Sequence, residues 1–184
     1  ACDVEACRDA MFAGDIINRT ENRAVLHTAL RSSFAGGDSI HREVSAELAQ
    51  VKQFSDAIRS GERKGWSGRT FTDVVCVGVG GSNLGPQMVT EALSPIADEQ
   101  LKLHYISSVD AVPLARLLSR LNAETTLFVI SSKTFTTSET MLNAKTAKRW
   151  FLQAATVETI DYLLYKYDAS DDMRGIRRCG RRGK

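Results

Sequence analysis

Long apolar runs and paired cysteines are both absent from this sequence of 184 residues. No stretch approaches the ~20 consecutive apolar residues that a membrane-spanning helix needs, and the polar start, ACDVEACRDA, does not resemble a secretory signal. None of the four cysteines, at positions 2, 7, 76 and 179, belongs to a CxxC pair. This cysteine usage is typical of a reducing compartment, so we expect a cytoplasmic protein without a membrane partner.

Acidic residues are absent from the last part of the chain, where positive charge accumulates. The formal net charge is +2, and residues 174–184 contain six basic side chains, so subtracting these leaves the rest of the chain at −4. No aromatic residue stands among these arginines, which favours a solvated tail and no nucleic-acid partner. Apolar residues are few from position 168 onward, and we predict that the divergent segment 155–184 is a disordered basic tail.

The beginning of the chain predicts a helical segment over residues 1–68. Thr20 fits an N-cap, and the helix that follows it would carry Val25, Leu26, Ala29 and Leu30 on one face. A second helix is expected over residues 39–61, because apolar residues recur there at spacings of three and four. These apolar positions are Val44, Leu48, Val51, Phe54 and Ile58.

From residue 69 to residue 154 the pattern changes to alternating strands and helices. The nearly continuous apolar run at 73–79 suits a strand that is buried on both faces. Two more strands are expected at 101–106 and 125–130, and helices at 86–93, 113–121 and 138–154. Alternation of this kind predicts an α/β fold, with a parallel sheet covered by helices on both faces.

A glycine-rich loop, GVGGSNLGP at residues 78–86, follows the first expected strand. Its glycines permit positive φ and let a ligand approach the backbone closely. The dinucleotide fingerprint would need glycine at position 83, where asparagine stands, and a Walker loop would need Gly-Lys-Ser/Thr, which is absent. Taken alone, the loop is weak evidence, and a tight turn and a ligand loop remain equally open.

A second loop, SSKTFTT at residues 131–137, leads from the third expected strand into a helix. Hydroxyl groups and unpaired backbone amides converge at such a helix N-terminus and favour an anion. The hydroxyls at 132, 134, 136 and 137 exceed what capping needs, since one oxygen suffices. The alternative is a Ser/Thr-rich cap without a ligand. No metal-binding cluster accompanies the loop, so a phosphate monoester held without metal or cofactor fits better than a magnesium nucleotide.

Three stretches of the sequence, in the same order, resemble the glucose-6-phosphate isomerase family. Residues 132–140, SKTFTTSET, resemble the family signature SKTFTT-x-ET, and residues 78–86 resemble its GIGGSDLGP loop. Residues 11–31 are similar to the stretch that precedes these two motifs in the family. The whole resemblance covers residues 11–153. It implies that residues 69–154 form a flavodoxin-like sugar isomerase (SIS) domain. It also implies a glycolytic and gluconeogenic enzyme that interconverts glucose 6-phosphate and fructose 6-phosphate.

The resemblance implies roles for individual residues as well. The hydroxyls of loop 132–137 and the amides near Lys133 would hold the phosphate, while Gly81 and Ser82 would contact the sugar. The implied substrate-binding residues are Gly81, Ser82, Ser132, Lys133, Thr134, Phe135, Thr136 and Thr137. Glu139 matches an acidic residue that helps to orient a catalytic histidine, although a glutamate in a first turn also stabilises its own helix. We expect no metal and no cofactor, and the resemblance implies a homodimer for the full-length form.

The sequence departs from the family in length. Family enzymes are much longer, and their catalytic glutamate, histidine and lysine come from later segments. Because isomerisation needs a base within hydrogen-bond reach of its proton, we expect this polypeptide alone to bind sugar phosphates without turnover. The resemblance stops past Ala154, and a frame shift or truncation would produce such an ending. The alternative interpretation is a non-catalytic SIS module that senses sugar phosphates.

Overall fold

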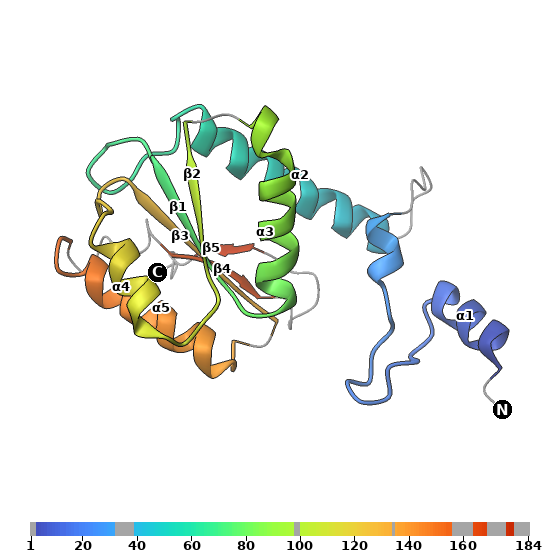
Figure 1. Ribbon diagram of the computed structural model, residues 1–184. Helices are drawn as coiled ribbons and strands as arrows, with labels where there is room; N and C mark the ends of the chain where they lie inside the picture. The colour runs from blue at the N-terminus through green and yellow to red at the C-terminus, as the bar shows by residue number, and fades with distance from the viewer. Residues whose placement is uncertain are drawn as a thin grey trace, which may run out of the picture. The chain divides into compact units, whose positions relative to one another are not determined.

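The computed structural model of the chain, shown in Figure 1, describes residues 3–31, 39–97, 100–133, 135–155, 164–168 and 176–178. The chain separates into two compact units, residues 1–48 and 49–184, which are described here one at a time. The boundary lies inside the helix Ser39–Arg59. The expected division into a helical segment 1–68 and a domain from residue 69 stays a prediction. No helix of the described part is long and apolar enough to cross a membrane.

The first unit begins with helix α1, Val4–Ala13. The side chain of Asp3 accepts a hydrogen bond from the backbone N–H of Ala6, at 3.1 Å, and Gly14 ends the helix with φ +78°. An aspartate at the N-cap and a left-handed glycine at the C-cap are the usual signals for these two positions. This helix lies within the expected helical segment 1–68, where the residue pattern placed no helix before Thr20.

The helix predicted from Thr20 is wrong, because residues 18–23 form a turn closed by an antiparallel bridge between Asn18 and Arg23. The Asn18 side chain accepts the backbone N–H of Glu21 at 3.2 Å, which offers this amide an alternative to a helical bond. Only a 3-10 helix, η1, His27–Leu30, follows the turn. The second predicted helix is confirmed as α2, Ser39–Arg59, whose last residues, 49–59, belong to the second unit.

A five-stranded sheet forms the centre of the second unit, in the order β2-β1-β3-β4-β5. The strands are β1 Asp73–Val77, β2 Lys102–Ile106, β3 Thr126–Ser132, β4 Leu164–Asp168 and β5 Ile176–Arg178. The first four pair in parallel, whereas β5 runs antiparallel to β4. The predicted α/β fold with a parallel sheet is therefore confirmed, and β5 adds an antiparallel strand at the edge of this sheet.

The helices of this unit connect the strands and cover both faces of the sheet (Figure 1). They are α3 Gly81–Leu93, η2 Ser94–Ile96, α4 Ala111–Leu118 and α5 Ser138–Phe151. Helices α4 and α5 lie on one face, and α3 and the end of α2 lie on the other. The expected helices match apart from their ends, with one larger difference: α3 begins at Gly81 and not at 86.

Strands β4 and β5 lie in the segment that we predicted to be a disordered tail, so that prediction does not hold for them. Leucine and tyrosine at 164, 165 and 167 favour strands, and β4 supplies backbone partners to the edge of β3. Residues 156–163, 169–175 and 179–184 lie outside the described residues.

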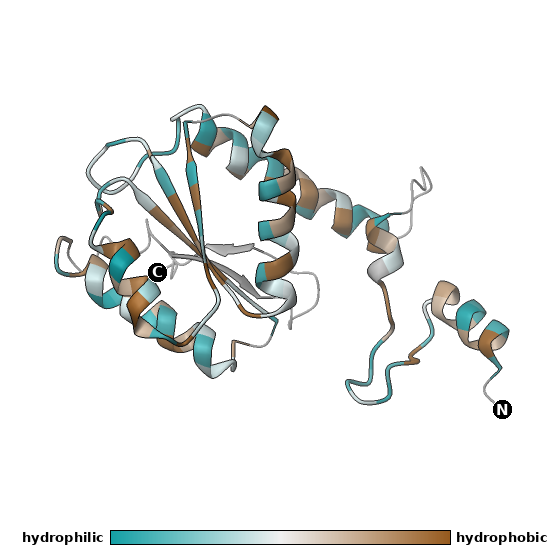
Figure 2. Ribbon diagram, viewed as in Figure 1, coloured by the Kyte–Doolittle hydropathy of each residue, from teal (hydrophilic) through white to brown (hydrophobic). Residues whose placement is uncertain are grey.

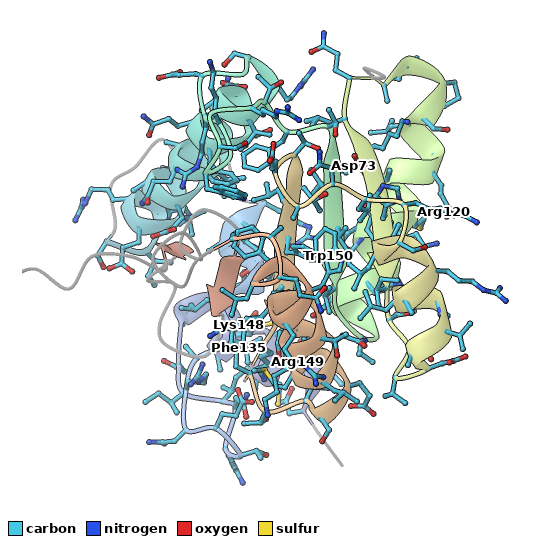
Figure 3. All side chains as sticks on the ribbon, turned by 90° about the vertical axis from the view of Figure 1, so that its left-hand side faces the viewer. Asp73, Arg120, Phe135, Lys148, Arg149 and Trp150 are labelled. Carbon is cyan, nitrogen blue, oxygen red and sulfur yellow. The ribbon has the colours of Figure 1, made fainter. Side chains whose placement is uncertain are left out.

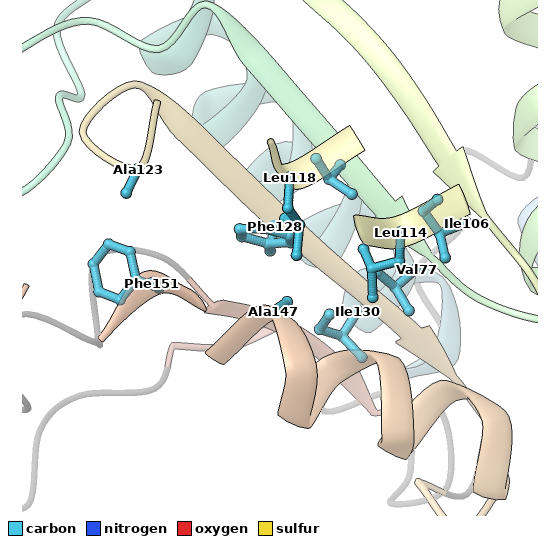
Figure 4. Packing of buried hydrophobic residues seen from close by; sticks show 10 residues of the cluster. Val77, Ile106, Leu114, Leu118, Ala123, Phe128, Ile130, Ala147 and Phe151 are labelled. Carbon is cyan, nitrogen blue, oxygen red and sulfur yellow. The ribbon is translucent and has the colours of Figure 1, made fainter. Parts of the chain in front are cut away.

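Alternation along the strands divides the core between the two faces of the sheet. Figure 2 shows apolar residues concentrated along β1 and β3, whereas the helices carry both apolar and polar residues. One cluster packs α4 and α5 against the first face (Figure 4). Its buried members are Val75, Val77, Ile106, Leu114, Leu118, Ala123, Phe128, Ile130, Ala147 and Phe151. A smaller cluster on the other face contains Ile58, Phe71, Val74 and Leu127, with Cys76 packed against it.

Burial raises the pKa of the Cys76 thiol from 9.0 to about 11. The folded state therefore keeps this proton to a higher pH than the unfolded chain does. We expect the contribution of Cys76 to the free energy of unfolding to be constant below pH 9 and to decrease between pH 9 and 11, by at most about 3 kcal/mol. Urea unfolding of the wild type and Cys76→Ala across this range measures the effect. If both proteins lose stability with the same slope, the thiol is not responsible.

Candidate functional site

The glycine-rich loop turns sharply at the carboxyl end of β1. The N–H of Gly78 donates to the carbonyl of Ile106 at 3.1 Å, which ties the end of β1 to the end of β2. A methyl group on Gly78 would lie 2.8 Å from the carbonyl oxygen of Ser82, so only glycine fits where α3 approaches the strand. Gly80, the residue before α3, has φ +58° and ψ −125°, a conformation that favours glycine.

The first turn of α3 begins inside this loop, which explains why the helix starts earlier than predicted. The amide of Ser82 donates to the carbonyl of Val79 at 3.2 Å, and the amide of Leu84 donates to that of Gly80 at 2.8 Å. Gly81 is exposed, and a methyl group added to it would meet no atom within 4 Å. Ser82 is half-buried. Gly81 and Ser82, which are predicted to contact the sugar, are thus the first two residues of α3, beyond the carboxyl end of β1.

The second loop leaves the carboxyl end of β3 at Ser132, which is 5% exposed. The hydroxyl oxygen of Ser132 accepts the backbone N–H of Phe135 at 3.1 Å, and Phe135 has φ +52°. Lys133 and Thr136 are exposed, whereas Phe135 is half-buried and packs against the first core cluster. Thr134 lies outside the described residues. The predicted binding residues therefore divide into exposed side chains and side chains that hold the loop.

Helix α5 follows this loop, and its N-cap, Thr137, makes no side-chain capping bond. Helix α3 also lacks such a bond at Gly80. Helix α4 differs, because the side chain of Asp110 accepts the N–H of Val112 at 2.9 Å. The helices that leave β1 and β3 thus present N-termini without a side-chain cap, while the helix that leaves β2 is capped by a carboxylate.

These two helices start from neighbouring strands, β1 and β3. The chain runs from β1 to β2 on one side of β1 and then crosses to β3 on the other side of β1. The strand order therefore reverses between β1 and β3. In open α/β sheets, ligands bind beyond the carboxyl ends of the strands at such a reversal. The positive ends of the two helix dipoles favour negative charge there. The geometry therefore suits a small anion between the starts of α3 and α5.

Asn83 is a buried polar residue in α3 whose environment the sequence did not reveal. It is 4% exposed, and its amide nitrogen donates to Gln87 Oε1 at 3.0 Å. The Gln87 nitrogen donates in turn to a carboxylate oxygen of Glu91 at 2.8 Å. Since a carboxylate only accepts, it fixes the direction of this chain and leaves Asn83 Oδ1 as an acceptor. Among the described residues, this oxygen has no hydrogen-bond partner.

Two residues of α5 lie close to the second loop in sequence. Glu139 is half-buried in the first turn, a position that suits the positive end of the helix dipole. Asn143 is 3% exposed, and its side chain donates to the carbonyl of Ser108 at 2.8 Å. This bond ties α5 to the loop after β2. The orienting role implied for Glu139 stays a prediction.

One further polar pair, His104 and Asp73, connects β2 to β1. His104, the middle residue of β2, has its Nε2 2.8 Å from Oδ1 of Asp73 at the beginning of β1, and Figure 3 shows Asp73 and Phe135 at opposite ends of the sheet. This pair belongs to neither of the two loops. Within the described ranges, no group of three or more His, Cys, Asp or Glu residues could hold a metal ion.

An open groove of about 850 Å³ lies on the second face of the sheet, between the end of α2 and α3. Its lining is mostly apolar, with Arg59 and Lys102 as its charged residues. The groove includes no residue of the two loops. We place the candidate site at the loops because several polar groups converge there, whereas the groove offers few fixed donors or acceptors.

Comparisons with known proteins show which family this chain resembles. A family model described as phosphoglucose isomerase matches residues 1–164. The glucose-6-phosphate isomerase of Pseudoalteromonas translucida (strain TAC 125) is 56% identical over 159 residues, which are 84% of this chain and 29% of that protein. The chain thus spans less than a third of the length of this curated relative.

Two solved structures share the fold. A glucose-6-phosphate isomerase from Chlamydia trachomatis aligns with a TM-score of 0.70 at 24% identity, covering 91% of this chain and 33% of that chain. A hypothetical protein from Thermus thermophilus aligns with a TM-score of 0.60 at 18% identity, covering 89% and 33%. These likenesses bear on the fold alone. The family model and the 56% identity together show that the chain belongs to the phosphoglucose isomerase family.

Proposed function

We propose that this chain supplies the phosphosugar-binding part of a glucose-6-phosphate isomerase, as its first SIS domain. The observation that carries the proposal is the pair of helix N-termini without side-chain caps, those of α3 and α5, on the neighbouring strands β1 and β3. Both helix dipoles favour a phosphate dianion at this place. Family membership supports a hexose 6-phosphate as the source of that dianion.

The residues divide into two sets in this proposal. Loop 132–137 holds the phosphate with the hydroxyls of Ser132, Thr134 and Thr137 and with the amides near Lys133. Gly81 and Ser82 contact the sugar at the start of α3, where the open space beside Gly81 supports a close approach of the ligand to the backbone. No metal or cofactor takes part, and the binding energy comes from hydrogen bonds and fixed dipoles.

Isomerisation between an aldose and a ketose moves a proton between adjacent carbons, which requires a positioned base. At the carboxyl end of the sheet, Asp110 is engaged in capping α4, and Glu139 lies in the first turn of α5. We therefore propose that the 184 residues alone bind hexose phosphates and do not convert them. In the complete enzyme, a cytoplasmic homodimer, the base comes from other segments.

Gly81→Ala tests the binding site without disturbing the fold. The added methyl group meets no atom within 4 Å, and alanine is the better helix former, so the melting temperature should stay equal or rise slightly. The same methyl group would occupy the space that the ligand needs. We expect the Kd for glucose 6-phosphate, measured by NMR titration, to increase at least about tenfold, which is about 1.4 kcal/mol.

Gly85→Ala is the matched control, because it makes the same change in the same helix, also without a contact. It should leave the Kd unchanged. Equal binding by the wild type and both variants would contradict the placement of the sugar at Gly81. The same titration with fructose 6-phosphate should show no glucose 6-phosphate forming, and turnover by a preparation free of host isomerase would contradict the second part of the proposal.

A further inference from the structure

Phe135 combines a left-handed backbone with a side chain that packs in the core. Its φ is +52°, which glycine adopts freely and phenylalanine adopts only against steric resistance. The ring packs against the buried cluster that joins β3 to α4 and α5. A packed side chain can hold a strained backbone, because relaxation of the backbone would pull the ring out of its contacts.

The backbone of Phe135 is also tied to the end of β3. Its N–H donates to the hydroxyl oxygen of Ser132 at 3.1 Å, and Ser132 is itself buried. The loop is thus fixed at the strand by this bond and at the core by the ring, three residues before α5 begins at Ser138. Phe135 is the residue of the described part of this loop that has a left-handed backbone.

We propose that Phe135 is a positioning residue, whose ring anchors the anion loop in its binding shape and does not contact the ligand. This inference rests on the proposed function of loop 132–137. It goes further, because the family resemblance places Phe135 among the substrate-binding residues, whereas in the structure its ring packs against the buried core cluster. The loop would then be ready for the anion before the ligand arrives.

The test is a set of three substitutions, with NMR titrations of both inorganic phosphate and glucose 6-phosphate. Phe135→Leu keeps an apolar anchor and should bind both ligands within about threefold of the wild type. Phe135→Ala keeps the unfavourable φ without the anchor, so both Kd values should increase by the same factor, at least about tenfold. In Phe135→Gly, the glycine adopts the positive φ without strain but has no ring to anchor the loop. Its Kd values should lie between those of Phe135→Leu and Phe135→Ala.

The ratio of the two Kd values separates positioning from direct contact. If the ring touched the sugar, the alanine variant would lose affinity for glucose 6-phosphate and keep it for inorganic phosphate, and this result would overturn the proposal. Phe151→Leu serves as the control, because it changes the same buried cluster at the far end of α5. It should lower the melting temperature and leave both Kd values unchanged. Unchanged Kd values in Phe135→Ala would also overturn the proposal.

A measurement without ligand keeps this inference separate from the proposed function. If the wild type binds neither ligand, the proposed function fails, and the positioning role is then judged by hydrogen exchange at the backbone amide of residue 135. This amide should be protected in the wild type and in Phe135→Leu, through its bond to Ser132, and should exchange rapidly in Phe135→Ala. Equal exchange in all three proteins would overturn the proposal.

Discussion

Gly78→Ala is expected to destabilise the second unit by about 3 kcal/mol and to abolish measurable binding of glucose 6-phosphate. The added methyl group would lie 2.8 Å from the carbonyl oxygen of Ser82 and 3.1 Å from its carbonyl carbon. These are backbone atoms of the first turn of α3, so no side-chain rotation can relieve the clash. The start of α3 must move away from β1, and the proposed sugar contacts at Gly81 and Ser82 move with it.

The comparison with Gly85→Ala isolates this effect from the general consequences of replacing glycine. Gly85→Ala lies inside α3, where the added methyl group meets no atom within 4 Å, and should stabilise the protein by up to about 1 kcal/mol. Urea unfolding gives the free energy of unfolding of both variants, and NMR titration gives their affinities. A Gly78→Ala protein as stable as the wild type would show that α3 does not approach β1 as closely as described.

Phe128→Ala is expected to lower the free energy of unfolding by about 3–5 kcal/mol. Phe128 lies in β3, is 1% exposed, and makes an edge contact with Trp150 of α5, with 5.9 Å between the ring centres. Its removal leaves a cavity between the strand and α5, where the surrounding backbone is held by β1 and β4. A loss of this size is a large part of the stability of a typical domain.

Leu142→Ala provides the control for this prediction. Leu142 belongs to α5, like Trp150, but its side chain is 50% exposed. Its truncation should change the free energy of unfolding by no more than about 0.5 kcal/mol. Equal losses for the two variants in urea unfolding would contradict the prediction. Phe128, packed between β3 and α5, would then contribute no more to stability than the half-exposed Leu142.

The strands β1, β2 and β3 could be predicted because apolar runs in a parallel sheet stand out from the loops around them. The start of α3 could not, since glycines in a sequence indicate a loop, whereas the amides of Ser82 and Leu84 close the first helical turn there. The helix expected from Thr20 failed for a local reason, the competing bond of Asn18 with Glu21. Strand β4 was missed because it lies in a segment that ends in a basic stretch with few apolar residues, a composition typical of disorder.

For the candidate site, the composition of the two loops predicted an anion site, and the strand order brings the loops to neighbouring strands. The sequence did not distinguish the exposed side chains from those that hold the loop. The turn between Ser132 and Phe135 depends on a φ value that a phenylalanine seldom adopts. The direction of the Asn83–Gln87–Glu91 hydrogen bonds likewise depends on side-chain geometry that a residue pattern does not contain.

The pairing of β1 with β3 has a kinetic consequence. At the beginning of these strands, the hydroxyls of Thr72 and Thr125 lie 3.0 Å apart, although 53 residues separate them in the chain. Pairing strands that are so far apart in the chain is slow compared with forming a helix, and the two helix ends of the proposed site meet only after this pairing. A ligand that bridges them therefore has nothing to bind in the early stages of folding. It acts on the finished structure, as a clamp that slows unfolding and leaves the folding rate unchanged.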